Sequence, residues 1–363
     1  MYKSFRVKNF RCFKDLQIND LGRVNLIAGK NNTGKTALME AMYIHSGNRD
    51  PMTLLRSNVR YDYASVRSVE QAFPEPMTNI SWNVIFNNFC TKEDIELSAT
   101  FSQRNNLAPE LKLSVITQYQ EGYDEILRNV HIFNEYISEI LVFKSGLDAE
   151  PFILVLTDMR VFPTYLSNQK LITNSEFLMA RKKVDTNVNA ERFSNMRQSG
   201  TDKVLVDALK LIEPRLKKLE ILAYGGQPHI HADIELDQLI SVSNLGDGMN
   251  RISSLILAMS EVPGGVVFID EIENGIHHSV QKKVWKAIGQ VARDLDIQVF
   301  ATTHSLEMIR AAYEAFRENK KLNEFRYHRL DRDRDTGDIE AVTYNEFGMD
   351  AVAAFDFEYE VRG

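Results

Sequence analysis

Cysteine is nearly missing from this chain of 363 residues: only Cys12 and Cys90 are present, and they form no CxxC pair. So few cysteines exclude a disulfide framework and a cysteine-based zinc site. They are typical of a protein kept in a reducing compartment. We therefore expect a cytoplasmic protein.

Long apolar runs are also lacking. The most apolar stretches, 252–259 and 264–269, are far shorter than the roughly 20 residues that a helix needs to cross a bilayer. Residues 1–14 carry charges among their apolar positions, which is unlike a secretory signal. The sequence therefore predicts neither a membrane span nor a leader.

Positive charge is in short supply, with 43 Lys and Arg against 50 Asp and Glu and a net charge of −7. This balance argues against a protein that coats nucleic acid by bulk electrostatics, although it leaves room for a local basic patch. Internal repeats and heptad arrays are missing too, which excludes a long coiled coil.

What is present is an α/β pattern. The opening residues, 1–48, read as strand, turn, strand, glycine-containing loop and helix. After Gly264 strands again alternate with helices, at 266–269, 280–295, 298–301 and 305–319. This alternation predicts a mixed or parallel central sheet flanked by helices.

The middle of the chain reads differently. Short apolar runs there predict an antiparallel β lobe, at 82–89, 95–101, 111–119 and 152–157. The pattern further predicts helices and a hairpin, at 123–140, 204–219 (interrupted at Pro214) and 224–236. Residues 166–202 are polar and aperiodic, so we expect a surface insertion. Three parts follow from this reading, 1–165, 166–220 and 221–363.

The strongest motif is Gly29-Lys30-Asn31-Asn32-Thr33-Gly34-Lys35-Thr36, which matches GxxxxGK[ST] between a strand and a helix. Backbone N–H groups of such a loop, together with the helix N-terminus, form an anion nest for phosphates. Lys35 is expected on the β- and γ-phosphates and Thr36 on Mg²⁺. Ala37 follows in the helix. A chance Lys-Thr in a glycine-rich turn is the alternative, which the flanking elements disfavour.

Two further groups follow apolar strands. Asp270 and Glu271 directly follow the strand 266–269. At this place the first acid is expected to bind Mg²⁺ and the second to act on the attacking water. A solvated turn is the alternative. His304 ends the next strand, where it could contact the γ-phosphate; a histidine satisfied by backbone groups is the alternative.

In this order the three motifs resemble the ATPase heads of the ABC superfamily, in the branch that holds SMC proteins, the double-strand-break repair ATPase and the OLD defence ATPases. The opening segment Phe5-Arg6-Val7-Lys8-Asn9-Phe10-Arg11-Cys12-Phe13 is similar to the start of this branch. The resemblance covers about 1–48 and 240–310. It implies a P-loop ATPase fold that binds ATP and Mg²⁺, with Lys35, Glu271 and His304 as catalytic groups and Asp270 as metal ligand.

The resemblance also implies a composite site. The segment Ser243-Asn244-Leu245-Gly246-Asp247-Gly248-Met249 occupies the place of the family's signature motif, which caps the γ-phosphate of a second subunit. Its serine is missing, so Ser243, Asn244 or the amides at Gly246 and Gly248 would supply the contact. A plain helix-capping loop is the alternative. A head-to-tail homodimer or a higher oligomer follows from this reading.

Three residues take weaker roles from the resemblance. Arg11 is a candidate phosphate or adenine contact, and Gln71 is a candidate Q-loop glutamine. His277 stands where the family has an interface aspartate.

The leading functional prediction is an ATPase subunit that acts as a nucleotide-dependent switch on a separate effector, such as a nuclease or toxin. In this it is similar to the ATPase of PARIS-type anti-phage systems. A DNA repair or chromosome-associated ATPase and a transporter subunit are the alternatives. No nuclease is expected within this chain, because the alternating acids Asp331, Asp333 and Asp335 are typical of a solvated hairpin.

Overall fold

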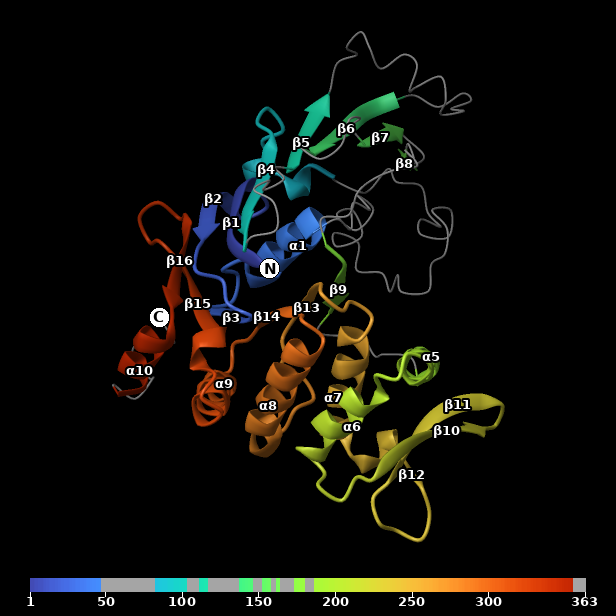
Figure 1. Cartoon of the computed structure of the whole chain (residues 1–363). Helices are drawn as coiled ribbons and strands as arrows, with labels where there is room; N and C mark the ends of the chain where they lie inside the picture. Colours follow the sequence, from blue (N-terminus) through green and yellow to red (C-terminus); the bar gives the residue numbers. More distant parts are fainter. Residues whose placement is uncertain are drawn as a thin grey trace.

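A six-stranded sheet forms the centre of the structure, a computed structural model that describes residues 1–46, 82–102, 111–116, 137–145, 152–157, 161–163, 173–179 and 186–354 (Figure 1). The strand order is β16-β15-β3-β14-β13-β9, and every pair except β15–β16 is parallel. The strands are β3 (Val24–Gly29), β9 (Ser175–Leu178), β13 (Val266–Ile269), β14 (Gln298–Thr302), β15 (Phe325–Arg332) and β16 (Ile339–Tyr344). This sheet confirms the predicted α/β class.

Each face of the central sheet carries its own core. All residues of β13 and β14 are buried. Val267 and Ile269 pack into one apolar cluster, whereas Val266 and Phe268 pack into the other. Successive side chains of a strand point to opposite faces, so a continuous apolar run is what a doubly covered parallel strand requires.

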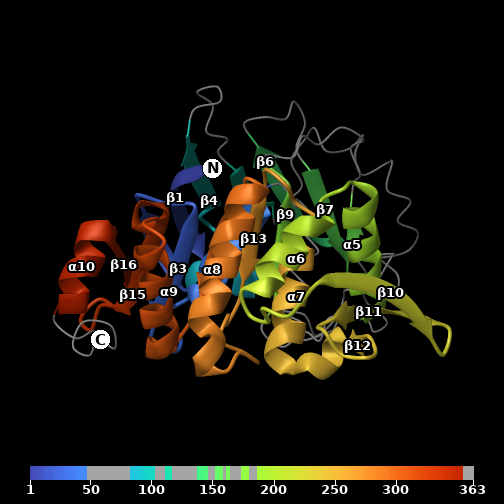
Figure 2. The same ribbon diagram turned by 60° about the horizontal axis from the view of Figure 1, so that its bottom comes forward.

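Helices cover one face, and Figure 2 shows α6, α7, α8 and α9 lying across it. The other face packs against α1 and the N-terminal strands. The helices are α1 (Lys35–Ser46), α5 (Thr186–Gln198), α6 (Asp202–Lys210), α7 (Asp247–Met259), α8 (His278–Asp294), α9 (Leu306–Glu318) and α10 (Glu346–Ala354). None of the helices within the described ranges is long and apolar enough to cross a membrane.

The predicted antiparallel lobe is confirmed as a seven-stranded sheet in the order β2-β1-β4-β5-β6-β7-β8. Its strands are β1 (Tyr2–Phe10), β2 (Phe13–Ile18), β4 (Ile95–Phe101), β5 (Leu111–Ile116), β6 (Ile137–Ser145), β7 (Phe152–Thr157) and β8 (Val161–Pro163). A smaller sheet contains the predicted hairpin, with β10 (Lys218–Tyr224), β11 (Gln227–Asp233) and β12 (Ile240–Ser241).

One predicted strand is wrong. Residues 82–89 form two 3₁₀ turns, η3 (Trp82–Ile85) and η4 (Asn87–Phe89). Asn88 has a φ of 49°, a left-handed conformation that asparagine tolerates better than most residues. The Asn87 side chain donates to the Arg11 carbonyl at 2.8 Å, so the segment braces the β1–β2 turn. Two further 3₁₀ turns are η5 (Val242–Leu245) and η6 (Leu322–Glu324).

The predicted helix 123–140 is wrong over its described end, because 137–140 belongs to β6. There the chain pairs with β5 on one side and β7 on the other. The apolar residues of this run fit a helical period as well as a strand period, and the pairing of neighbouring strands decides between them. The remainder of that prediction, like Gln71, lies outside the described residues.

Residues 166–202 are not a surface insertion where the structure describes them. β9 extends the central sheet by pairing in parallel with β13, and Phe193 of α5 is fully buried. The polar residues of α5 cover its exposed side, which concealed the apolar stripe that faces the core. The helix predicted at 204–219 is shorter in the structure. It corresponds to α6, which ends at Lys210, four residues before Pro214, a residue that an α-helix interior does not tolerate.

Candidate active site

The P-loop joins the end of β3 to the start of α1, as the motif requires. Gly34 has a φ of 85°, and a Cβ there would lie 2.6 Å from both Cys12 Sγ and Phe13 Cζ. Gly29 has a φ of 149°, and a Cβ there would lie 2.4 Å from the Leu330 carbonyl oxygen. A side chain at either position is therefore excluded both by close contact with neighbouring segments and by the positive φ of the turn.

Lys35 folds back over this loop. Its Nζ donates to the carbonyl oxygens of Gly29 at 2.8 Å and Lys30 at 2.9 Å. Burial lowers the pKa of Lys35, and the carboxylates of Asp270, Glu273 and Glu271 oppose that effect. The ammonium group thus lies between the phosphate-binding loop and the acids that follow β13.

Thr36 and Asp270 meet although 234 positions separate them in the sequence. The Thr36 hydroxyl lies 3.2 Å from each carboxylate oxygen of Asp270. Burial raises the pKa of Asp270, and hydrogen bonds from Thr302 and Thr36 reduce that rise. A hydroxyl and a carboxylate that converge in this way are the oxygen donors that suit Mg²⁺, which keeps its other positions for water and phosphate.

The described residues hold no cluster of three or more His, Cys, Asp or Glu that could bind a metal alone.

Thr302, which sequence reasoning missed, connects the two acids. Its Oγ1 donates to Asp270 Oδ1 at 2.6 Å and accepts from the backbone N–H of Glu271 at 2.8 Å. The residue ends β14, directly beside the end of β13 in the parallel register. A threonine at the end of the strand that precedes His304 was the available signal.

Glu271 is held in a tight turn with a φ of 47°. Its Oε2 accepts from Asn274 Nδ2 at 2.8 Å, and its Oε1 lies 3.5 Å from His304 Nε2. The carboxylate is one-third exposed and lies beside the imidazole. The structure thus brings together the acid and the histidine that the sequence places in separate motifs.

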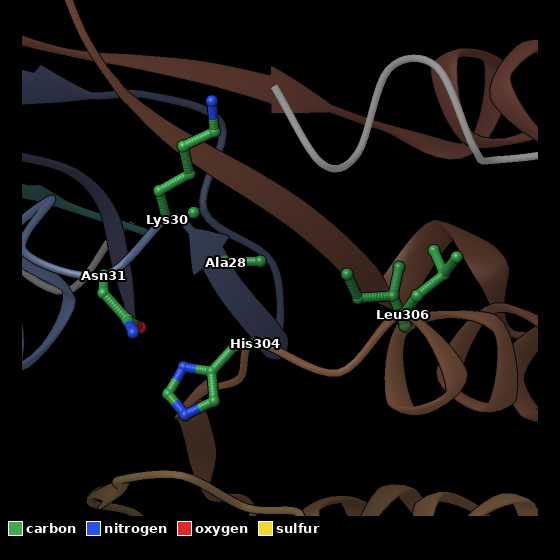
Figure 3. Close-up of a pocket in the computed structure, with 7 residues that line it drawn as sticks. Ala28, Lys30, Asn31, His304 and Leu306 are labelled. Carbon is green, nitrogen blue, oxygen red and sulfur yellow. The ribbon is translucent and has the colours of Figure 1, made fainter.

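A pocket of about 410 Å³ opens beside these groups. Its lining comes from the end of β3, the first P-loop residues, the loop after β14 and α9: Ala28, Gly29, Lys30, Asn31, His304, Leu306 and Ile309. Figure 3 shows Asn31 and His304 on one side of this lining, with the Lys30 chain extending away from them. The pocket therefore connects the phosphate-binding loop with the histidine.

The signature-like loop does not join this cluster. Ser243 and Asn244 lie exposed in η5, and Gly246, with a φ of 101°, is the N-cap residue of α7. Figure 1 places β12 and the start of α7 well away from β3 and the start of α1. A contact between this loop and a nucleotide stays a prediction that needs a second subunit.

Three other predicted residues have local partners. Arg11 forms an ion pair with Glu40 of α1, with Nε 3.0 Å from Oε2. His277 caps the N-terminus of α8 by accepting from the Ser279 N–H. Asp333 accepts from the N–H groups of Asp335 and Thr336 in the β15–β16 turn, which confirms the hairpin reading of that acidic run.

A family described as "AAA domain, putative AbiEii toxin, Type IV TA system" matches residues 98–310, more than half of the chain. The chain belongs to this AAA family. The matched part contains the acids after β13 and His304, whereas the P-loop precedes it. This membership confirms an ATPase of AAA type.

Three relatives are similar over different lengths. An ATP/GTP phosphatase of Helicobacter pylori is 26% identical over 88% of this chain and 89% of its own length. The DNA replication and repair protein RecF of Oceanobacillus iheyensis is 24% identical over 65% of this chain and 59% of its own length. An OLD nuclease of Thermus scotoductus is 30% identical over 26% of this chain and 19% of its own length.

Proposed function

We propose that this AAA protein binds ATP with Mg²⁺ at the P-loop and hydrolyses the bond between the β- and γ-phosphates. The convergence of Thr36 with Asp270, beside Lys35, carries this proposal. A hydroxyl and a carboxylate at a phosphate-binding loop are the protein groups that a nucleotide-bound magnesium ion uses. The Helicobacter pylori relative, an ATP/GTP phosphatase, supports the same reaction class.

The residues divide the work as follows. Lys35 leaves the Gly29 and Lys30 carbonyls and places its ammonium on the β- and γ-phosphates. Thr36 and Asp270 would hold Mg²⁺, which would supply positive charge to the phosphate oxygens. Glu271 accepts a proton from the water whose oxygen attacks the γ-phosphorus, and ADP departs. His304, beside Glu271, contacts the γ-phosphate from the pocket.

The proposed site is completed by a second copy in a head-to-tail homodimer. In one subunit the loop Ser243–Gly248 lies away from the P-loop, so it cannot close its own site (Figure 1). The N-terminus of α7 supplies backbone N–H groups and a positive dipole end. In a two-fold dimer those groups face the partner's γ-phosphate and replace the missing serine.

Nucleotide state then sets dimer geometry, and that geometry holds or releases a separate effector. The family description names a putative toxin and one relative is a nuclease, so both of these effector activities are named among similar proteins. A second candidate function, in DNA repair, is favoured by the similarity to RecF.

Phosphate release from ATP and GTP tests the proposal. We expect turnover that requires Mg²⁺, that stops in the presence of EDTA, and that is lost in Asp270→Asn but kept in the control Asp338→Asn. Addition of duplex DNA separates the two candidates: stimulation by DNA supports repair, and unchanged turnover supports the effector switch. Wild-type protein that releases no phosphate contradicts the proposed reaction.

A further inference from the structure

Glu273 is a carboxylate that the proposed reaction does not use. It lies in the turn after β13, where its Oε1 accepts a hydrogen bond from the backbone N–H of His304 at 2.9 Å. The same oxygen lies 3.6 Å from His304 Nε2. One carboxylate oxygen therefore contacts both the main chain and the ring of the histidine.

The burial of Glu273 makes this arrangement costly. Its side chain is 14% exposed, and its second oxygen, Oε2, is buried without a hydrogen-bond partner. An unsatisfied buried oxygen of this kind destabilises the fold. Asn274 in the same turn donates to Glu271 and so does not relieve it. Stability alone does not explain a carboxylate at this position.

His304 needs such a restraint. Its side chain is 42% exposed and lines the open pocket, so the ring has room for other rotamers. The main chain on either side is tied down, because the N–H of Thr303 donates to the Ile27 carbonyl and that of Ser305 to Thr303 Oγ1. The remaining N–H, that of His304, is held by Glu273.

We propose that Glu273 is a positioning residue that keeps the His304 imidazole beside Glu271, and thereby sets the rate of hydrolysis without setting nucleotide affinity. This inference rests on the proposed ATPase function. The separation between rate and affinity follows from the contacts. The hydrogen bond and the ring contact of Glu273 go to His304, whereas Lys35 is bonded to the P-loop carbonyls and is influenced by Glu273 only through its charge.

Three substitutions of Glu273 test the role. Glu273→Ala removes the acceptor, and we expect kcat to fall roughly 10- to 100-fold while KM for ATP changes less than about twofold, because a small misplacement of a reacting group is costly. Glu273→Gln keeps an oxygen that accepts from the His304 N–H, so it should restore kcat to within about threefold of wild type. Glu273→Asp, one methylene shorter, should lie between them.

The matched control is Glu307→Ala. Glu307 follows the same loop in the first turn of α9, where it accepts from the Ser305 hydroxyl. We expect its loss to leave kcat within about twofold of wild type. Thermal melting of each variant shows that it is folded; if Glu273→Ala does not fold, the comparison of Glu273→Asp with Glu273→Gln still tests the role.

A double-mutant cycle decides whether Glu273 acts through His304. If it does, Glu273→Ala combined with His304→Ala should be no slower than His304→Ala alone. Three results would overturn the inference: rate losses that multiply in the double variant, a rise in KM that accompanies the fall in kcat, or a Glu273→Gln variant as slow as Glu273→Ala. In each of these cases turnover by the wild-type protein would leave the proposed ATPase function standing. Wild-type protein without turnover overturns both.

Discussion

Thr302 donates a hydrogen bond of 2.6 Å to Asp270 across the ends of two parallel strands, and the same hydroxyl oxygen accepts the N–H of Glu271. One small side chain therefore orients the proposed metal ligand and the proposed general base together. Because β13 and β14 pair in parallel, their ends meet at one edge of the sheet, and the hydroxyl both donates and accepts there through a single oxygen atom.

Thr302→Val keeps the shape of the side chain and removes both hydrogen bonds. We expect kcat for ATP hydrolysis to fall roughly 10- to 100-fold with little change in ATP affinity. Phosphate-release kinetics measure the change in kcat, and calorimetry measures the affinity for ATP. The control Thr100→Val, at an exposed position of β4, alters no bond to either acid and should stay close to wild type. Equal rates in both variants would show that Thr302 does not orient the acids.

Lys35→Ala should abolish tight ATP binding, because it removes the cation expected on the β- and γ-phosphates. The matched control is Lys14→Ala, a lysine at an exposed position of β2. Calorimetry should show binding within about threefold of wild type for the control. If Lys35→Ala binds ATP as wild type does, the P-loop assignment is wrong.

Glu271→Gln retains the shape of the side chain but cannot accept a proton from water. It should bind ATP and hydrolyse it slower by a factor of about 10²–10⁴. The ATP-bound variant should accumulate as a closed dimer, which light scattering detects. The control is Glu340→Gln, which removes an exposed carboxylate outside the proposed site. Wild-type turnover in Glu271→Gln would remove this residue from the mechanism.

Gly248→Asp tests the composite site. A Cβ at Gly248 would lie 3.7 Å from Val280 Cγ2, an ordinary contact, so Gly248→Ala should remain active and the aspartate should be tolerated by the fold. The added anion at the start of α7 should block hydrolysis yet leave ATP binding to the monomer intact.

Mixing Gly248→Asp with Lys35→Ala should restore about one working site per heterodimer, because each supplies the half that the other lacks. Specific activity of wild type should also rise with protein concentration in the dilute range. Activity independent of concentration, with a dead mixture, would mean that each subunit holds a complete site.

His328 predicts how stability depends on pH. Burial lowers its pKa from 6.5 to about 3, with Arg326 adding to the effect. The unfolded chain therefore binds a proton below pH 6.5 that the folded chain excludes. The contribution of His328 to stability is complete above pH 6.5 and is lost progressively as the pH falls toward 3. At pH 5 the loss should reach about 2 kcal/mol.

Urea unfolding at pH 7 and pH 5 measures this loss. The comparison is with His328→Gln, which can still bond Thr343 and Asn25, the partners of the imidazole, but cannot take up a proton. The variant should lose less stability than wild type between the two pH values. Equal losses would assign the acid sensitivity to other groups.

The sequence by itself determined the parts of the site that are local. The P-loop lies between one strand and the helix that follows it, and the pair Asp270–Glu271 ends an apolar run, so chain order alone predicts phosphate-binding and acidic groups. The alternation of strands and helices after Gly264 likewise predicted a mixed or parallel sheet flanked by helices, because parallel neighbours are joined by crossover helices.

Only the tertiary structure decided which distant groups meet. β9 was hidden by its polar surroundings, and its place beside β13 depends on pairing between segments that chain order does not relate. Thr302 and Glu273 were missed for the same reason: their roles lie in hydrogen bonds to Asp270 and His304 across strand ends. A position at or after a strand end does not reveal the partner of a side chain, since side-chain partners are selected by register and burial rather than by spacing along the chain.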